Sequence, residues 1–229
     1  MTAVKAPPLP LQQPEPSLTA PYDHLPRAER YLHRTRDEAL LALLRRNSIE
    51  SLAGLRILEL GCGSGALLRS LITYGASADR LAGIDSNFRR LRRAGNGSGA
   101  NVALADGALL PYRSEAFDLV FVFTALSAMV DLDVRRHAAH EALRVLRPGS
   151  LVIVYDFWTN PFNSGVRPVS PAELRHIFEP HAAQIERVTL APPLVRLLGG
   201  REPLCHTLER LPFLHTHLLA AIAKERADA

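Results

Sequence analysis

The residues with the clearest chemical meaning form a glycine-rich segment in the first third of the chain. Residues 57–65 read Ile-Leu-Glu-Leu-Gly-Cys-Gly-Ser-Gly, an apolar run followed by three glycines at every second position. Glycine lets the backbone turn sharply and leaves no Cβ between the main chain and a bound molecule. A helical pattern restarts at Ala66. This strand–loop–helix order predicts a cradle for a nucleotide-type cofactor in a doubly wound sheet.

Two acidic residues follow, each at the end of a predicted strand. Asp85 closes the apolar segment 81–84, and Asp106 closes the segment 102–105. An acid at the second strand end can accept hydrogen bonds from ribose hydroxyls, which suits NAD and S-adenosylmethionine equally. An acid at the third strand end can accept one from an adenine amino group, which a second nucleotide half would not need. Taken singly, either acid is equally well explained as a helix cap.

Five short segments occur in a set order along the chain. They are Glu59-Leu-Gly-Cys-Gly-Ser-Gly65, Gly83-Ile-Asp85, Asp106-Gly-x-x-Leu-Pro111, Phe117-Asp-Leu-Val120 and Arg144-Val-Leu-Arg-Pro-Gly149. In this order and spacing, residues 30–156 resemble class I S-adenosylmethionine-dependent methyltransferases. Residues 156–221 resemble, more loosely, a subgroup of small bacterial methyltransferases, some of them encoded beside glycan-assembly genes. Its segments are Asp156-Phe-Trp-x-Asn160, Val166-Arg-Pro168, Leu190-Ala-Pro-Pro-Leu194 and Leu211-Pro-Phe-Leu-His-Thr-His217.

The resemblance implies S-adenosylmethionine as cofactor and a set of contacts to it. The glycine loop would present its backbone to the methionine and ribose parts, with Glu59 beneath the loop. Asp85 would take the ribose hydroxyls and Asp106 the adenine amino group, and Phe123 and Thr124 would border the methyl donor. The predicted cofactor-binding residues are Glu59, Gly61, Cys62, Gly63, Asp85, Ser86, Asp106, Gly107, Ala108, Phe123 and Thr124.

The acceptor side carries fewer motifs. Residues 123–127 read Phe-Thr-Ala-Leu-Ser, without the Asn/Asp-Pro-Pro-Tyr/Phe element of methyltransferases that modify amino groups of bases. A hydroxyl oxygen of a small molecule or sugar is therefore the expected acceptor. A hydroxyl needs help to lose its proton, and Asp156, at the end of the fifth strand, is the predicted catalytic base or substrate orienter. Trp158 and Arg167 are predicted to bind substrate, the arginine as a clamp on an acidic group.

Other polar residues allow two interpretations. His215 and His217 alternate with Thr216 in the last predicted strand, where they could face the pocket or the solvent. Asp131 and Asp133 could join Asp156 around a divalent metal. Because hard cations need more oxygen ligands than these, no metal is predicted.

The composition is typical of a globular domain rather than of a membrane or disulfide-rich protein. The chain has 229 residues, 47% of them hydrophobic, a net charge of +4 and two cysteines. No apolar run approaches the ~20 residues of a membrane span, and no signal-type stretch begins the sequence, so a cytoplasmic protein is expected. Residues 89–93 hold four arginines, which fit either a solvated helix face or a preference for an anionic substrate. No aromatic residues interleave with them, so no nucleic-acid partner is predicted.

Alternating strand and helix patterns predict an α/β fold with a doubly wound, mostly parallel sheet. Residues 1–26 hold seven of the 17 prolines and form a predicted loosely ordered lead. A single domain is expected over 27–229, with 157–215 as a cap on the acceptor side that includes two short helices within 191–214. Tyr31, on the first helix, either reaches the cofactor pocket or anchors the helix to the core. Strands are expected at 55–60, 81–85, 101–105, 117–123, 150–155, 184–190 and 215–223.

The last of these strands is ambiguous by periodicity. Residues 216–223 fit a terminal helix equally well, and only the resemblance implies an antiparallel strand beside 151–155. Two rival functions also stay open. One is an NAD(P)-dependent oxidoreductase with a Rossmann fold, and the other is a non-catalytic module that binds S-adenosylmethionine.

Overall fold

The computed structural model describes residues 22–160 and 165–225. Residues 1–21 of the predicted proline-rich lead lie outside the described residues. Tyr22, near the end of that lead, is buried. Helix α1 (Arg27–Arg46) follows directly and buries one stripe of its surface. The described chain therefore begins with a segment that packs on the domain.

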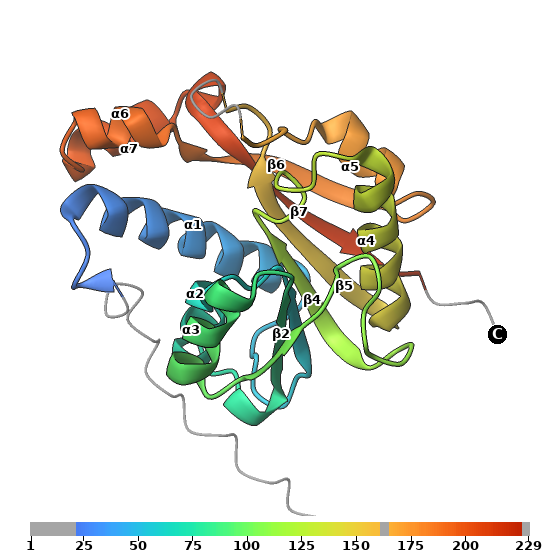
Figure 1. The fold of residues 1–229 in the computed structure, drawn as a ribbon. Coiled ribbons are helices and arrows are strands. Elements are labelled where there is room, and N and C mark those ends of the chain that lie inside the picture. The colour runs from blue at the N-terminus through green and yellow to red at the C-terminus, as the bar shows by residue number, and fades with distance from the viewer. Residues whose placement is uncertain (1–21, 161–164, 226–229) are drawn as a thin grey trace, which may run out of the picture.

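The strands form one seven-stranded sheet in the described chain. They are β1 (Ile57–Leu60), β2 (Leu81–Asp85), β3 (Asn101–Leu104), β4 (Phe117–Phe123), β5 (Leu146–Phe157), β6 (Ala183–Leu190) and β7 (His215–Ala223). Their order is β3-β2-β1-β4-β5-β7-β6 (Figure 1). The strands from β3 to β5 run parallel, and β7 runs antiparallel to both of its neighbours. The predicted fold class is confirmed.

The last strand settles the ambiguity between strand and helix. In the register of β5 and β7, Leu151 lies opposite Ala223 and Tyr155 opposite Leu219. Strand β7 lies between β5 and β6, and a hydrophobic cluster covers each of its faces. Leu218 packs into the core on one side of the sheet and Leu219 into the core on the other. A strand buried on both faces reads as a continuous apolar run, which explains why periodicity could not distinguish it from a helix.

One predicted boundary is wrong. The fifth strand starts at Leu146 rather than at residue 150, so Pro148 and Gly149 lie inside β5. Leu146 pairs with Phe117, and the register then shifts before Leu119 pairs with Leu151. This irregularity accommodates the Pro-Gly pair, because a proline in a sheet needs an edge or a bulge where its missing N–H is not required.

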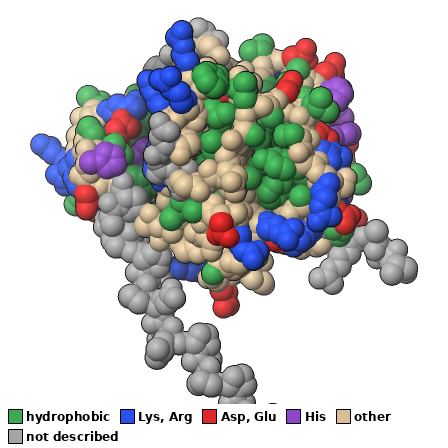
Figure 2. All heavy atoms as spheres, turned by 60° about the horizontal axis from the view of Figure 1, so that its bottom comes forward, with side chains coloured by type: hydrophobic (Ala, Val, Ile, Leu, Met, Phe, Trp, Pro, Cys, Tyr) green, Lys and Arg blue, Asp and Glu red, His purple; other side chains and the backbone are tan. Residues whose placement is uncertain are grey.

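Helices cover both faces of the sheet. They are α2 (Ala66–Thr73), α3 (Phe88–Ser98), α4 (Leu132–Val145), α5 (Pro171–Ile177), α6 (Pro192–Leu197) and α7 (Glu202–Glu209). Helices α1, α2 and α3 lie on one side and α4 and α5 on the other, while α6 and α7 extend from the sheet beside α1 (Figure 1). The two short helices predicted within 191–214 are confirmed as α6 and α7. Side-chain types are not evenly distributed over the surface. Hydrophobic side chains gather over part of one face, with Lys and Arg beside them (Figure 2).

Two hydrophobic clusters form the core, one on each face of the sheet. Alternate residues of β4 belong to different clusters: Val120 and Val122 pack with α4 and α5, whereas Leu119 and Phe121 pack with α1 and α2. A smaller third cluster joins the start of α1 to α6 and α7. Since side chains alternate across a strand, this two-sided packing holds the strand ends, and the residues that follow them, in place.

Candidate functional site

The glycine loop lies between β1 and α2 and is held by backbone hydrogen bonds. The N–H groups of Gly61 and Cys62 both donate to the carbonyl of Ile84, each at 2.8 Å. Gly61 has φ +79°, and a Cβ there would lie 2.7 Å from the Cβ of Ala125. Gly63 has φ +54°, but a Cβ there would meet no atom within 4 Å. One side of the loop is therefore packed, and the other leaves room for a bound molecule.

Asp85 fixes the shape of this loop. Its carboxylate is buried and accepts from the Gly63 N–H at 2.8 Å and from the Asn87 N–H at 2.7 Å. Each oxygen keeps a second lone pair for a further donor. Ser86, the neighbouring predicted contact, is exposed. The structure thus brings Asp85 and the glycine loop together, as the motif spacing predicts.

The third predicted acid lies in a tight turn after β3. Asp106 is exposed, and its Oδ1 accepts from the Ala108 N–H at 2.9 Å. The Ala108 N–H predicted to serve a cofactor is therefore already paired inside the turn. Gly107 is buried against β1, where a Cβ would lie 3.1 Å from Leu60 Cδ2. The turn consequently packs close to the base of the glycine loop.

Glu59 is a buried acid with one unused oxygen. Its side chain is 3% exposed, and Oε2 has no hydrogen-bond partner among the described residues. Burial raises the pKa of Glu59 to about 8, and the nearby charge of Arg36 opposes that rise. An unsatisfied buried carboxylate oxygen costs free energy unless a donor reaches it. Glu59 is therefore suited to receive a donor from a bound molecule.

Arg36, which sequence reasoning missed, enters the site from α1. Its side chain is only 12% exposed and is held by Asp37, with Nε and Nη2 each 2.7 Å from Oδ1. Asp37 also accepts from the hydroxyls of Tyr22 and Tyr74. The only sequence signal is that Asp37 falls in the buried stripe of α1, where an unpaired charge would be costly.

Aromatic side chains line the ends of β4, β5 and the start of β7. The ring centroids of Phe123 and Tyr155 lie 5.2 Å apart, and the imidazole of His217 stacks on Tyr155 at 4.6 Å and contacts Phe157 at 4.1 Å. Burial, aided by the charge of Arg36, lowers the pKa of His217 to about 3, so the ring is neutral. The sequence left open whether His217 faces the pocket or the solvent, and the structure buries it.

The neighbouring predicted residues have mixed placements. Thr124 is exposed with φ +50°, and its N–H donates to the carbonyl of Tyr155 at 2.7 Å. Such a backbone conformation is uncommon for a non-glycine residue and is often found at functional sites.

Cys62 is buried, and burial raises the pKa of its thiol to about 12, so it is no nucleophile. His215 bridges two carbonyls, those of Arg187 and Glu209.

Asp156, the predicted catalytic residue, is enclosed. It is 1% exposed, and its oxygens accept from the backbone N–H groups of Ser127 and Phe157 at 3.0 and 2.8 Å. Burial raises its pKa, and these hydrogen bonds oppose the rise. The carboxylate thus ties the loop after β4 to the end of β5, and its predicted role toward the substrate, as base or as orienter, stays a prediction.

The two predicted substrate residues also make structural contacts. The indole N–H of Trp158 donates to the His215 carbonyl at 2.7 Å, and the guanidinium of Arg187 lies 4.0 Å from the Trp158 ring centroid. Arg167 is exposed and donates to the Val130 carbonyl at 3.0 Å. These contacts place both residues near the loops that follow β4 and β5.

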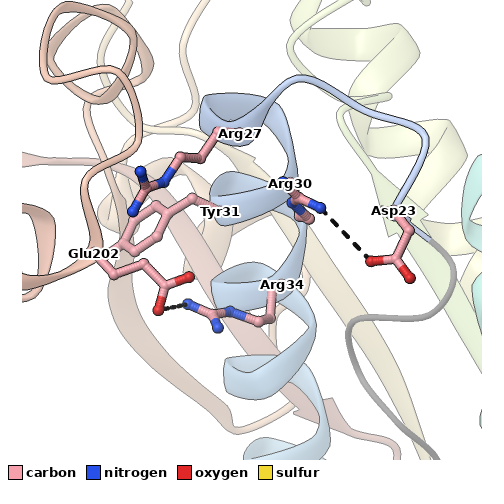
Figure 3. Close-up of a pocket in the computed structure, with 6 residues that line it drawn as sticks. All are labelled: Asp23, Arg27, Arg30, Tyr31, Arg34 and Glu202. Atoms are coloured by element: carbon pink, nitrogen blue, oxygen red, sulfur yellow. Dashed lines mark ion pairs between the residues drawn. The ribbon is translucent and has the colours of Figure 1, made fainter.

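Tyr31 anchors the first helix to the core and is the second of the two roles that the sequence allowed. It is buried against α6 and α7 in the small third cluster, and its hydroxyl has no hydrogen-bond partner among the described residues. Figure 3 shows it beside a pocket between α1 and α7, where Arg34 pairs with Glu202 at 3.2 Å and Arg30 with Asp23 at 3.7 Å. Tyr31 thus holds the start of α1 to the C-terminal helices.

Within the described residues, no three His, Cys, Asp or Glu side chains group at distances that suit a metal ion. Asp131 caps α4 and accepts from the Asp133 N–H at 2.8 Å. Likewise, no helix in the described part of the chain has the length and hydropathy needed to cross a bilayer.

Comparisons with known proteins agree with this geometry. Residues 58–154 match the family described as a methyltransferase domain. A curated relative, 27-O-demethylrifamycin SV methyltransferase of Amycolatopsis mediterranei, is 33% identical over 121 residues, which cover 50% of this chain and 43% of the relative. The chain spans about half the length, or less, of the curated relatives it matches.

Solved structures share the fold at low sequence identity. An S-adenosylmethionine-dependent methyltransferase from Mesorhizobium loti matches with a TM-score of 0.57 and 21% identity, over 80% of this chain and 97% of its own. The [4+2]-cyclase SpnF matches with a TM-score of 0.60 and 18% identity, over 83% and 82%. The glycine loop, the strand-end acids, the sheet order and the family match agree. Residues 58–154 therefore match a methyltransferase domain, within a fold shared with methyltransferases that use S-adenosylmethionine.

Proposed function

We propose that the protein transfers a methyl group from S-adenosylmethionine to a hydroxyl oxygen of a small-molecule or sugar acceptor. The observation that carries the proposal is the pairing of an open glycine loop with a buried acid beneath it. Among the described residues, no atom lies within 4 Å of where a Gly63 Cβ would be, and one oxygen of Glu59 has no partner. When bound, the cofactor would supply an activated methyl group on a sulfonium centre.

Charged residues of the chain would hold the two ends of this cofactor. Glu59 would accept from its ammonium group, and the guanidinium of Arg36 would face its carboxylate, a charge-assisted pairing. Asp85 would accept from the ribose hydroxyls with its remaining lone pairs, and Asp106 from the adenine amino group. The arrangement would place an acid beside the positive group of the cofactor and a guanidinium beside its negative group.

The aromatic group at the strand ends would exclude water from the transfer. Methyl transfer is an in-line displacement that needs the acceptor oxygen aligned about 3 Å from the methyl carbon. The rings of Phe123, Tyr155 and His217 would form an apolar wall there. Asp156 would position the loop that begins at Ser127, and Trp158 and Arg167 would contact the acceptor beneath the cap of residues 157–215.

An oxygen acceptor is supported by sequence and by similarity. The segment after β4 lacks the element typical of enzymes that methylate amino groups of bases. The name of the Amycolatopsis relative also refers to a position on oxygen. A second candidate is a binding module that transfers no methyl group. The fold is shared with a protein named as a [4+2]-cyclase, so the fold alone does not specify methyl transfer.

The direct test combines binding with transfer. Calorimetry should show that S-adenosylhomocysteine binds the full chain and that NADH does not. Incubation with methyl-labelled S-adenosylmethionine and panels of sugars, phenols and lipids should label a hydroxyl-bearing acceptor. Absence of S-adenosylhomocysteine binding would contradict the cofactor site. Binding without labelling of any panel member would favour the binding module, and labelling of an amine would reject oxygen as the acceptor atom.

A further inference from the structure

Helix α3 presents a basic surface to the solvent. Arg89, Arg90, Arg92 and Arg93 are all exposed, and none of them forms an ion pair with a residue in the described part of the chain. Leu91 is buried, so the helix keeps one apolar side against the domain. Elsewhere on the surface, arginines such as Arg46 and Arg196 pair with acids. Helix α3 therefore places four arginines without an ion-pair partner within five consecutive residues.

Large apolar side chains are exposed beside these arginines. Phe88, the first residue of α3, is 62% exposed and lines a shallow hollow together with Arg89, Arg92 and Arg93. Leu104 is 57% exposed and ends β3, opposite Asp85 in the register with β2. Phe88 follows Asp85 by three residues, so Phe88 and Leu104 lie at the same edge of the sheet. Leu109, 76% exposed, follows in the turn after β3.

Acidic groups do little to offset the charge at this edge. Helix α3 carries no Asp or Glu. Asp85 is buried and occupied by two backbone N–H groups. Asp106 is exposed, but it is one carboxylate against four guanidinium groups. The combined surface of Phe88, Leu104, Leu109 and the four arginines, here termed the α3 face, is therefore both basic and apolar.

This combination matches the chemistry of an anionic lipid bilayer. Aliphatic and aromatic side chains can enter the boundary between headgroups and acyl chains, while arginines attract anionic headgroups. A nucleic acid would use the charge but not the two leucines, because aliphatic side chains offer no plane for base stacking. Exposed apolar residues surrounded by charge are typical of interaction surfaces.

We propose that the α3 face docks the protein on a membrane that contains anionic phospholipids. Since α3 follows β2 and the α3 face includes the end of β3, docking would bring the carboxyl edge of the sheet, where the glycine loop lies, close to the lipid surface. The proposal goes beyond methyl transfer and does not depend on it.

The test is sedimentation of the full chain with lipid vesicles. We expect binding to vesicles of phosphatidylcholine mixed with phosphatidylglycerol, and little binding to phosphatidylcholine alone or in high salt. The variant Arg89→Gln/Arg92→Gln/Arg93→Gln should lower the partition coefficient on the order of a hundredfold, because each arginine near an anionic surface contributes roughly fivefold. The matched control Arg175→Gln/Arg201→Gln/Arg210→Gln removes three exposed arginines elsewhere and should bind as the wild type does.

A second pair of variants tests the apolar part. Phe88→Ser should weaken vesicle binding, whereas Leu197→Ser, at a residue that is 83% exposed outside the α3 face, should not. Circular dichroism and thermal unfolding would confirm that each variant is folded. Three outcomes would overturn the proposal: no binding to anionic vesicles, equal losses in the control variants, or binding to single-stranded RNA with none to vesicles.

Discussion

Arg36 and Glu59 bring two ionisable side chains into a largely buried part of the molecule, from α1 and β1. Arg36 is compensated by Asp37, whereas Glu59 Oε2 has no partner among the described residues. Burial makes the ionised form of Glu59 unfavourable, which raises its pKa to about 8. Titratable groups with strongly shifted pKa values cluster at functional sites. The burial and the raised pKa of Glu59 are therefore typical of a residue at a functional site, and its position in the motif alone does not reveal them.

The raised pKa makes stability depend on pH in a defined direction. Between the ordinary pKa of 4.5 and the folded pKa of about 8, the folded chain holds a proton that the unfolded chain has released. This contribution is fully present below pH 4.5 and is lost as pH rises through 8, because stability falls wherever the folded state binds more protons. Glu59→Gln has no such group, so its stability advantage over the wild type should grow through this window, by about 1.4 kcal/mol per unit difference between the two pKa values.

Urea unfolding at a series of pH values would measure this difference. Other titrating groups are common to both proteins and cancel in the comparison. The control Glu38→Gln changes an exposed glutamate of α1 that pairs with Arg34, and it should alter the free energy of unfolding by less than about 1 kcal/mol because exposed ion pairs contribute little. A pH-independent difference for Glu59→Gln would show that Glu59 is ionised in the folded protein.

Among the secondary-structure elements, the loop between β1 and α2 combines a rigid inner side with an open outer side. Its inner side is fixed by Ile84, Asp85 and Ala125, whereas nothing lies where a Gly63 Cβ would be. A loop that binds a cofactor through its backbone must let the bound molecule come close to the main chain, which a position without a Cβ allows. The loop can thus be distinguished by substitution from a turn that serves only the fold.

Gly63→Ala should separate binding from stability. The positive φ costs roughly 1–2 kcal/mol for any L-residue, and the added methyl would occupy the space proposed for the cofactor. Affinity for S-adenosylhomocysteine should fall by about tenfold or more, which is about 1.4 kcal/mol. Gly54→Ala is the matched control, with φ +80° and no atom within 4 Å of the new Cβ, outside the loop.

Calorimetry and thermal unfolding of both variants would decide the point. The two should lose similar stability, and only Gly63→Ala should lose affinity. Equal affinities in the two variants would place the cofactor away from the loop. Gly61→Ala should be destabilised more strongly than either, since its Cβ would lie 2.7 Å from that of Ala125.

On the scale of the whole molecule, one arginine joins segments that are distant in sequence. Arg135, on α4, is 0% exposed, and its guanidinium donates to the carbonyls of Met129 at 2.7 Å and Arg167 at 2.5 Å and to Glu173 Oε1 at 2.5 Å. It therefore ties the loop after β4 to the segment before α5. These are the segments that carry Asp156's partner Ser127 and the predicted substrate residue Arg167.

Replacing Arg135 should destabilise the protein. Arg135→Met keeps a long side chain but leaves two carbonyls and a largely buried carboxylate without their donor. Breaking a buried ion pair from one side costs about 3–5 kcal/mol. Arg136→Met removes a partly exposed neighbour that pairs with the exposed Asp133 and contacts the exposed ring of His176, and it should cost less than about 1 kcal/mol.

Denaturant unfolding of the two variants would provide the comparison. A small loss in Arg135→Met would mean that the acceptor-side loops hold together without this link. A loss confined to affinity for an acceptor, with stability unchanged, would instead make Arg135 part of the binding site.

The sequence by itself determined the glycine loop, the two strand-end acids, the alternation of strands and helices, and thus a site for a nucleotide-type cofactor; the family resemblance added S-adenosylmethionine. These features are local, because periodicity of two or 3.6 residues and glycine spacing act over a few neighbours. The order of β1 to β5 follows from short right-handed crossovers. The last strand required the family resemblance, since its two-sided burial removes the alternation that would identify a strand.

Only the tertiary structure decided which polar residues are buried and what they face. The charge of Arg36 acts on Glu59 because α1 packs on the sheet, an influence between residues 23 positions apart that no spacing rule encodes. Asp156 is a strand-end acid like Asp85 and Asp106, yet the loop at Ser127 closes over it. His217 is buried because its ring packs against those of Tyr155 and Phe157 on the neighbouring strand β5. Burial is a collective property of packed elements, so these environments arise only when the whole sheet is assembled.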